Sequence, residues 1–282
     1  MGGSIAVGFG GVGGSEALAW ATEQAERSGA RLTIVHVCVP GSPLTGATHA
    51  RLELLDPPLA RVYAKAQTCL GGHRVALEIR SGDPAAELVH ASAGAHLLVI
   101  GAGEGGRTVR RIIRHTHSPV VVVRPTRLPA HAPFAGHVVV GVDGSPAGRA
   151  AVEFAFAYAA EHQLPLAAAH ASTAEQDDYF YDDVTLSTHF AVEPAALELL
   201  AAETEPWSLK YPDVPVRRAV LHGPVDEALI QAAAGARLVV VGDKRRGVIG
   251  RARTGDVPLT VATEAACPVA VVPEDHDEGD LL

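Results

Sequence analysis

The sequence repeats one pattern twice, and this duplication constrains the fold more than any other feature. The run 138–145 reads VVVGVDGS, and residues 5–11 (IAVGFGG) occupy the equivalent place near the start of the chain. Gly82 and Gly101 recur 141 positions later, as Gly223 and Gly242. We therefore expect two homologous units of about equal length in one polypeptide.

The two copies differ by a deletion in the first. Gly106 and Pro119 recur 149 positions later, as Gly255 and Pro268, so the first copy lacks eight residues. The deletion falls in a Gly-rich loop after an apolar run, where α/β proteins often hold a ligand. We expect the two units to differ in function more than in fold.

Both copies alternate short apolar runs with longer Ala-rich segments, a pattern typical of parallel strands covered by helices. The sequence predicts an α/β fold made of two tandem five-stranded parallel-sheet sandwiches. The strands are expected near 5–9, 32–37, 75–80, 97–100 and 120–123, and near 138–142, 166–170, 216–221, 238–241 and 269–272.

Helix starts are marked by capping residues. Ser145 precedes Pro146, and Asp83 precedes Pro84, which are the residue types that begin helices. A further helix is predicted from about 15 to 28, and Pro224 or Asp226 should begin the counterpart of the helix at 84.

The chain divides into a first domain at 1–125, a linker at 126–136 with Pro129 and Pro133, a second domain at 137–274 and an acidic tail at 275–282. The acidic stretch 172–193 is predicted to be a solvated loop or an insertion that faces a partner. The last strands are nearly all valine, and exposed edges of this kind favour pairing. We expect the two halves to associate with each other and the chains to form a homodimer.

Composition narrows the function classes. The chain of 282 residues is 48% hydrophobic and 20% charged, with a formal net charge of −9. This charge disfavours general attraction to nucleic acid or anionic membranes, and no apolar run reaches the length of a membrane span. Three separated cysteines indicate neither disulfides nor a thiolate metal site, so we expect a cytoplasmic protein.

Catalysis is not predicted. Ser145, His170 and Asp143 resemble a nucleophile set, but Ser145 lacks the Gly-x-Ser-x-Gly turn that exposes an attacking hydroxyl. His115 and His117 have no accompanying ligand set, so no metal site is expected.

The sequence resembles the universal stress proteins in their tandem form, over almost its entire length. The matching features are Val-Asp-Gly-Ser at 142–145, His36 and His170, Ser-Gly-Asp-Pro at 81–84, His-Gly-Pro at 222–224, Val-Val-Gly at 240–242 and Cys-Pro-Val at 267–269. The resemblance implies five-stranded parallel sandwiches, pairing through the last strands and, in one branch of the family, an ATP site.

In nucleotide-binding members of that family, the loop after the fourth strand follows Gly-x2-Gly-x9-Gly-Ser/Thr. Glycines there let backbone amides and a helix N-terminus approach the phosphates. In the second unit Gly242 and Gly255 match, Arg245 replaces the second glycine, and Asp256 replaces the hydroxyl residue. By resemblance the other contacts come from Val142, Asp143, Gly144, Ala171 and Gly223, with Asp143 near the ribose and phosphates and the backbone near Ala171 at the adenine.

Three of these positions have two interpretations each. Arg245 can reach a phosphate through charged hydrogen bonds or marks a lost site. Asp256 either caps the following helix or tolerates a triphosphate through a bridging Mg²⁺, which is expected only if ATP binds. Asp143 is either a nucleotide contact or a turn residue that bonds its own backbone.

The first unit is less well equipped. Gly10 stands where the family has aspartate, and the shortened loop 101–106 runs directly into Arg107. The sequence therefore favours a universal stress protein that acts as a stress-response or regulatory module, with a residual adenine-nucleotide (ATP) site in the second unit. The alternative is an interaction module of the same fold in which both pockets have decayed. An adenylate-transferring enzyme of the same superfamily would need phosphate motifs that are absent.

Overall fold

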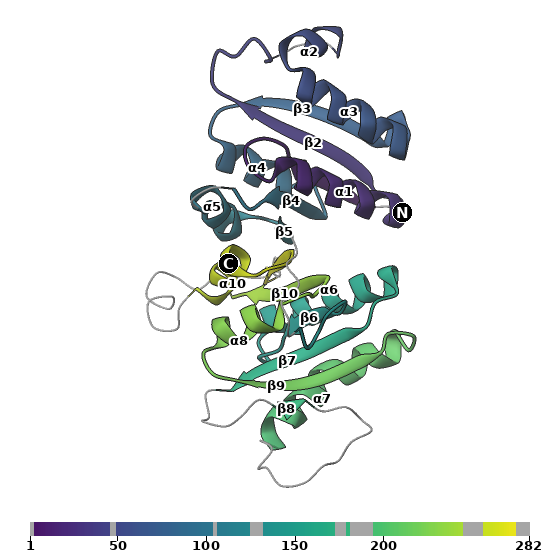
Figure 1. Ribbon diagram of the computed structural model, residues 1–282, viewed down its shortest axis with the longest axis vertical. Helices are drawn as coiled ribbons and strands as arrows, with labels where there is room; N and C mark the ends of the chain where they lie inside the picture. Colours follow the sequence, from purple (N-terminus) through teal and green to yellow (C-terminus); the bar gives the residue numbers. More distant parts are fainter. Residues whose placement is uncertain are drawn as a thin grey trace, which may run out of the picture. The chain divides into compact units, whose positions relative to one another are not determined.

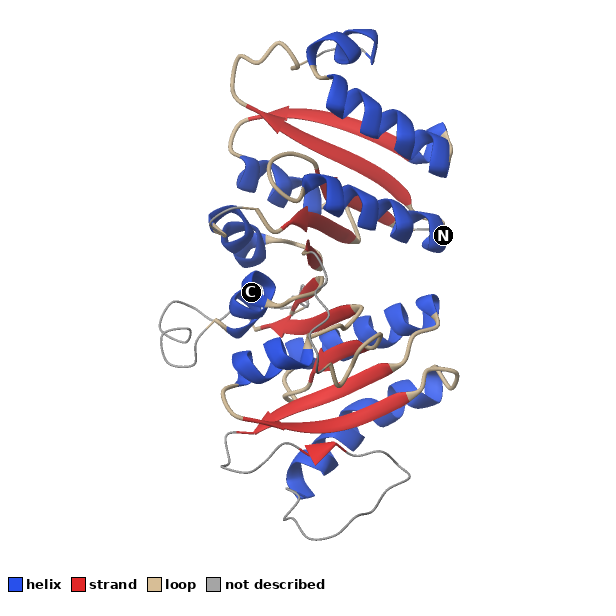
Figure 2. Ribbon diagram, viewed as in Figure 1, coloured by secondary structure: helices blue, strands red, loops and turns tan. Residues whose placement is uncertain are grey.

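A computed structural model describes residues 3–45, 49–103, 106–124, 132–172, 179–180, 194–244 and 256–274. The chain forms two compact units, Met1–Arg124 and Pro125–Leu282. Each unit is an α/β sandwich (Figures 1 and 2).

The sheet of the first unit has the strand order β3-β2-β1-β4-β5, and every described pairing is parallel. Its strands are β1 (Ser4–Gly8), β2 (Arg31–Cys38), β3 (Val75–Ser81), β4 (Leu97–Gly101) and β5 (Val120–Val123). The central strands are buried on both faces because helices cover both sides, which explains their continuous apolar runs.

Helices α1 (Gly14–Ser28) and α3 (Pro57–Leu70) pack together over one face of this sheet. Helices α4 (Pro84–Ser92) and α5 (Arg107–His115) pack together over the other. The remaining elements are α2 (His49–Leu55) and the short 3₁₀ helix η1 (Gly72–Arg74).

The second unit repeats this topology. Its parallel strands run in the order β11-β10-β6-β7-β9, with β6 (Val138–Gly141), β7 (Leu166–Ser172), β9 (Val216–His222), β10 (Leu238–Asp243) and β11 (Val269–Pro273). Helices α6 (Pro146–His162) and α7 (Pro194–Lys210) pack together, as do α8 (Val225–Ala232) and α10 (Val257–Glu264).

The sequence predicts a solvated loop or an insertion that faces a partner at 172–193. The loop expectation is wrong at β8 (Tyr179–Phe180), which pairs antiparallel with Val220 and Ala219 of β9. The pairing satisfies backbone hydrogen-bonding groups at the outer edge of β9. The pattern of apolar and polar residues in the sequence does not reveal such a pairing. The rest of that stretch, 173–178 and 181–193, lies outside the described residues.

The end of the expected linker is packed. Phe134 is fully buried, and the guanidinium of Arg217 lies 5.5 Å from the centre of its ring. The linker residues 126–131 and the acidic tail 275–282 lie outside the described residues, so the domain boundaries remain predictions. No described helix is both long and apolar enough to cross a membrane.

The helix starts confirm the capping expectations. Asp83 accepts a hydrogen bond from the Ala86 amide at the start of α4, and Ser145 accepts one from the Gly148 amide at the start of α6. Pro224 is the N-cap residue of α8, with Asp226 in the first turn.

Candidate functional site

A cavity opens in the second unit where β6, β7 and β10 reach their carboxyl ends, side by side in Figure 1. Its volume is about 250 Å³. In open α/β sheets this edge is where ligands bind, because the loops there leave a crevice between the strand ends. The described lining includes main chain of Gly141, apolar groups of Val225 and Leu229 on α8, and polar groups from the residues after β10.

A histidine holds the turn after β6 in place. The backbone amide of Val142 donates to the carbonyl of Ala169 (2.8 Å), and Nδ1 of His170 lies 2.8 Å from the carbonyl oxygen of Val142. The second bond requires a ring protonated on Nδ1. Together the two bonds fix Val142 at the floor of the cavity.

Asp143 has both carboxylate oxygens engaged. Its Oδ1 accepts hydrogen bonds from the Ser145 amide (3.0 Å) and hydroxyl (2.6 Å), and its Oδ2 lies 2.6 Å from Nζ of Lys244. Burial raises the pKa of Asp143, but the hydrogen bonds from Lys244 and Ser145 outweigh burial and hold that pKa below its usual value. The Ser145 bonds are those that the turn interpretation predicts.

Close packing joins the turn to its neighbours. A Cβ on Gly148 would collide with the Asp143 carboxylate, and a Cβ on Gly242 would collide with the backbone of Ala147. Glycine is therefore required at Gly242, where the obstacle is backbone, whereas a side chain at Gly148 would force the Asp143 carboxylate to move. This contact places the N-terminus of α6 beside the cavity.

The other predicted site residues have different positions relative to the cavity. Ala171 and Asp256 line the cavity, whereas Gly144 and Gly223 are not among the described residues that line it. Gly144 and Gly223 adopt positive φ angles of 71° and 110°, and the Gly144 carbonyl accepts from Nη1 of Arg149 at 2.7 Å. Arg245 and Gly255 lie outside the described residues.

Asp256 occupies the N-cap position of α10, as the capping interpretation predicts. Among the described residues its side chain makes no capping hydrogen bond, and its carbonyl accepts from the Thr260 hydroxyl at 3.1 Å. Asp256 therefore has the position of an N-cap residue, but its side chain does not make the hydrogen bond of a cap to the described residues of α10.

Two charged residues of the cavity are not among the predicted site residues. Asp243 ends β10 and is 5% exposed, and Lys244 follows it and reaches Asp143. A signal existed: the two lie directly after the strand-end glycine, at the edge where parallel α/β sheets bind ligands. Within the described part of the chain, no three His, Cys, Asp or Glu side chains gather as a metal site.

The first unit has a cavity of about 500 Å³ at the equivalent edge. Nδ1 of His36 lies 2.9 Å from the carbonyl oxygen of Phe9, which repeats the His170 contact. Gly10 stands at the position of Asp143, and Ala102 and Gly103 stand at those of Asp243 and Lys244. Among the described lining residues, none is an aspartate, glutamate, lysine or arginine.

The family model and the relatives that match this sequence belong to the same family. The sequence model of the universal stress protein family matches residues 3–124 and again residues 135–273. A universal stress protein of Mycobacterium tuberculosis is 32% identical over 283 residues, covering 92% of each chain, and one of Mycolicibacterium smegmatis is 31% identical over 274 residues, covering 91% of this chain and 92% of the relative.

Solved structures resemble the fold. A universal stress protein from Archaeoglobus fulgidus superposes with a TM-score of 0.67 at 14% identity, covering 99% of this chain and 98% of that one. A functionally unknown protein from Pseudomonas aeruginosa superposes with a TM-score of 0.59 at 15% identity, covering 96% and 92%. At these identities the likeness concerns the fold alone.

Proposed function

The chain belongs to the universal stress protein family, and we propose that its second unit binds an adenine nucleotide in the cavity beside Asp143 while its first unit does not. The proposal is for binding without catalysis, in a stress-response or regulatory module. The main support is that Asp143, Lys244 and Gly242 line one cavity. They supply a carboxylate acceptor, an ammonium and a backbone without a side chain.

The residues present suit the parts of a nucleotide. A ribose hydroxyl needs a carboxylate acceptor such as Asp143, and the purine needs backbone groups and apolar contacts of the kind that Ala171, Val225 and Leu229 provide. Phosphates need cations, and Lys244 is followed in the sequence by two arginines at 245 and 246.

The magnesium ion belongs to this proposal only with ATP. Asp256 lines the cavity, and a carboxylate facing a triphosphate is repulsive unless a cation lies between them. We therefore propose that ATP binds as its Mg²⁺ complex and that AMP binds without the metal.

Calorimetric titration with ATP and Mg²⁺ tests the proposal. We pair two substitutions that each fill one cavity: Ala171→Trp in the second unit and Val37→Trp at the matching position after His36 in the first. Ala171→Trp should abolish the heat of binding, and Val37→Trp should leave it unchanged. Heat no larger than that of dilution for the unsubstituted protein at millimolar nucleotide would instead favour the interaction module with two decayed pockets.

We also propose that the chain forms a homodimer and acts in the cytoplasm. The support is the apolar composition of β5 and β11. Light scattering across a dilution series tests the association, and a mass that stays at that of one chain would contradict it.

A further inference from the structure

We propose that nucleotide binding exchanges the partner of Lys244: the ammonium is held by Asp143 when the cavity is empty and moves to a ligand phosphate, which leaves Asp143 Oδ2 to accept a ribose hydroxyl. This inference rests on the proposed nucleotide site and assigns Lys244 as the residue that senses phosphate charge.

The hydrogen bonds of Asp143 favour an exchange. The amide and hydroxyl of Ser145 take Oδ1, and Nζ of Lys244 takes Oδ2 at 2.6 Å. One lone-pair site of Oδ2 stays open, so a ribose hydroxyl can bond beside Lys244, but it meets a stronger acceptor once the ammonium has moved to a phosphate. The Ser145 bonds belong to the turn and remain, because Ser145 also caps α6 through Gly148.

The exposure of the pair makes the exchange inexpensive. The side chains of Asp143 and Lys244 are 47% and 31% exposed, and ion pairs that reach water contribute little net free energy. A phosphate offers the ammonium several acceptor oxygens with more charge than one carboxylate. The lysine stem has four rotatable carbons, so the ammonium can change partner without backbone movement.

The first unit lacks both members of the pair. Gly10 and Gly103 occupy the positions of Asp143 and Lys244. Loss of only one member would leave a carboxylate or an ammonium without its counter-charge at the cavity, whereas loss of both leaves the described lining of that cavity with neither charge. The joint presence in one unit and joint absence in the other fit two residues that act together.

The test compares ligands that differ only in phosphate. Adenosine, AMP and Mg²⁺-ATP are titrated into the unsubstituted protein and into Lys244→Met, with Lys244→Gln as a second variant that keeps a polar group. We expect ATP binding to weaken about tenfold or more, because a charge-assisted hydrogen bond is lost. Adenosine should bind equally well or a few-fold more tightly, because the Asp143 carboxylate is a stronger acceptor without the ammonium beside it.

Arg237→Met is the matched control. Arg237 directly precedes β10 and Lys244 directly follows it, so the two substitutions remove the same charge at opposite ends of one strand. The control should leave all three affinities unchanged, which separates contact with a phosphate from the loss of net charge.

The outcomes separate the inference from the proposed function. Equal weakening of adenosine and ATP by both Lys244 variants, or no weakening of ATP, overturns the exchange while the nucleotide site stands. Absence of binding by all three ligands to the unsubstituted protein overturns the nucleotide site and the exchange together. Weaker binding of ATP together with unchanged or tighter binding of adenosine supports the exchange.

Discussion

The two units share a backbone plan but differ in the charges around one cavity. In both units, a histidine on the second strand contacts the backbone carbonyl of the residue that follows the first strand. In both, the glycine near the end of the fourth strand packs against the backbone at the start of the first helix. Among the described residues, only those of the second unit place a carboxylate and an ammonium there. Contacts that build the turn thus persist in both copies, whereas within the described residues the pair of opposite charges occurs in one.

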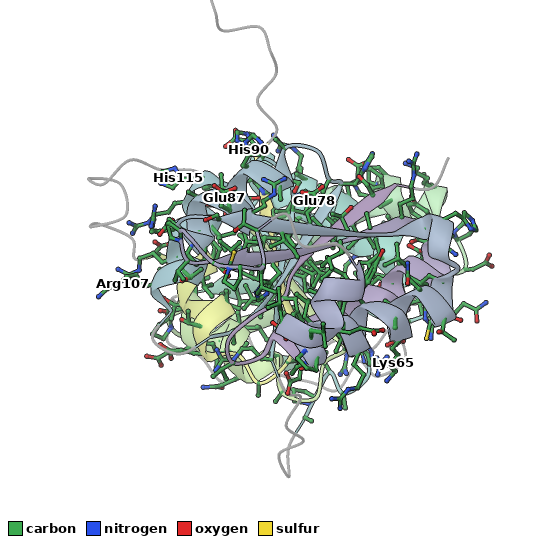
Figure 3. The ribbon with its side chains drawn as sticks, turned by 90° about the horizontal axis from the view of Figure 1, so that it is seen from above. Lys65, Glu78, Glu87, His90, Arg107 and His115 are labelled. Carbon is green, nitrogen blue, oxygen red and sulfur yellow. The ribbon has the colours of Figure 1, made fainter. Side chains whose placement is uncertain are left out.

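Surface charges on the first unit form different contacts. Arg80 bridges Glu78 (2.7 Å) and Glu87 (3.6 Å), both labelled in Figure 3. The matching positions in the second unit, Ala219 and Ala228, are buried and apolar. These three charged residues are not among the described residues that line the cavity of the first unit, whereas Asp143 and Lys244 line that of the second.

The largest effect is expected from the two strand-end glycines. Gly242→Ala and Gly101→Ala each drive a Cβ into rigid backbone, that of Ala147 and of Gly13 respectively. Each substitution should lower the free energy of unfolding of its own unit by about 3 kcal/mol, the upper part of the range for overpacking. Hydrogen exchange in denaturant, followed separately for the strands of each unit, measures this.

Gly94→Ala is the control for that pair, because nothing lies within 4 Å of its added Cβ. It should change stability by less than about 0.5 kcal/mol. A loss confined to one of the two strand-end variants would break the equivalence of the units.

The two histidines should have similar, smaller effects. His36→Ala and His170→Ala each leave a backbone carbonyl, of Phe9 and Val142, without its ring donor. A loss of about 1–2 kcal/mol is expected in each unit, because a part-buried acceptor then lacks its bond. Denaturant unfolding checks both, and a loss in only one unit would show that the shared contact has unequal weight.

The helix caps should distinguish the units. Ser145 caps α6 through the Gly148 amide (3.0 Å), whereas α1 begins after Gly13 with no side-chain capping bond. Ser145→Ala should cost the second unit about 1 kcal/mol. Thermal unfolding measures the change, with Ser42→Ala in the first unit as a hydroxyl-loss control outside any described helix; equal losses for both would remove the assignment to the cap.

The smallest effect concerns acid. The pKa of Asp143 is lowered, so its contribution to stability is present above the ordinary aspartate pKa of about 3.9 and is lost as pH falls through the folded value. In Lys244→Met the carboxyl keeps its burial and loses its cation, so its pKa should rise. NMR titration of labelled aspartates follows this.

Asp83 supplies the comparison for the acid measurement. The pKa of Asp83 is also lowered, by the Ala86 amide first and by Arg111 at 2.8 Å, and Asp83 lies in the other unit. Its pKa should be unchanged by Lys244→Met. Movement of both aspartates together would point to a change in net charge instead of loss of the local pair.

Much of the fold followed from patterns that are local in the chain. The ten main strands lie within a few residues of their predicted ranges because apolar runs buried on both faces are distinctive. Ser145 and Asp83 were identified as helix starts because a cap and its helix are only three residues apart. The strand β8 was missed because its pairing with β9 joins residues about forty positions apart.

The sequence alone determined the duplication, the order of strands and helices, and the glycine in place of a carboxylate in the first unit, since each depends on residue type and spacing. Tertiary structure alone decided that Lys244 faces Asp143 across one hundred residues of chain, and that both oxygens of that carboxylate are engaged. The reason is geometric: strands β6 and β10 are neighbours in the sheet, and only their pairing brings the residues that follow them to the same edge.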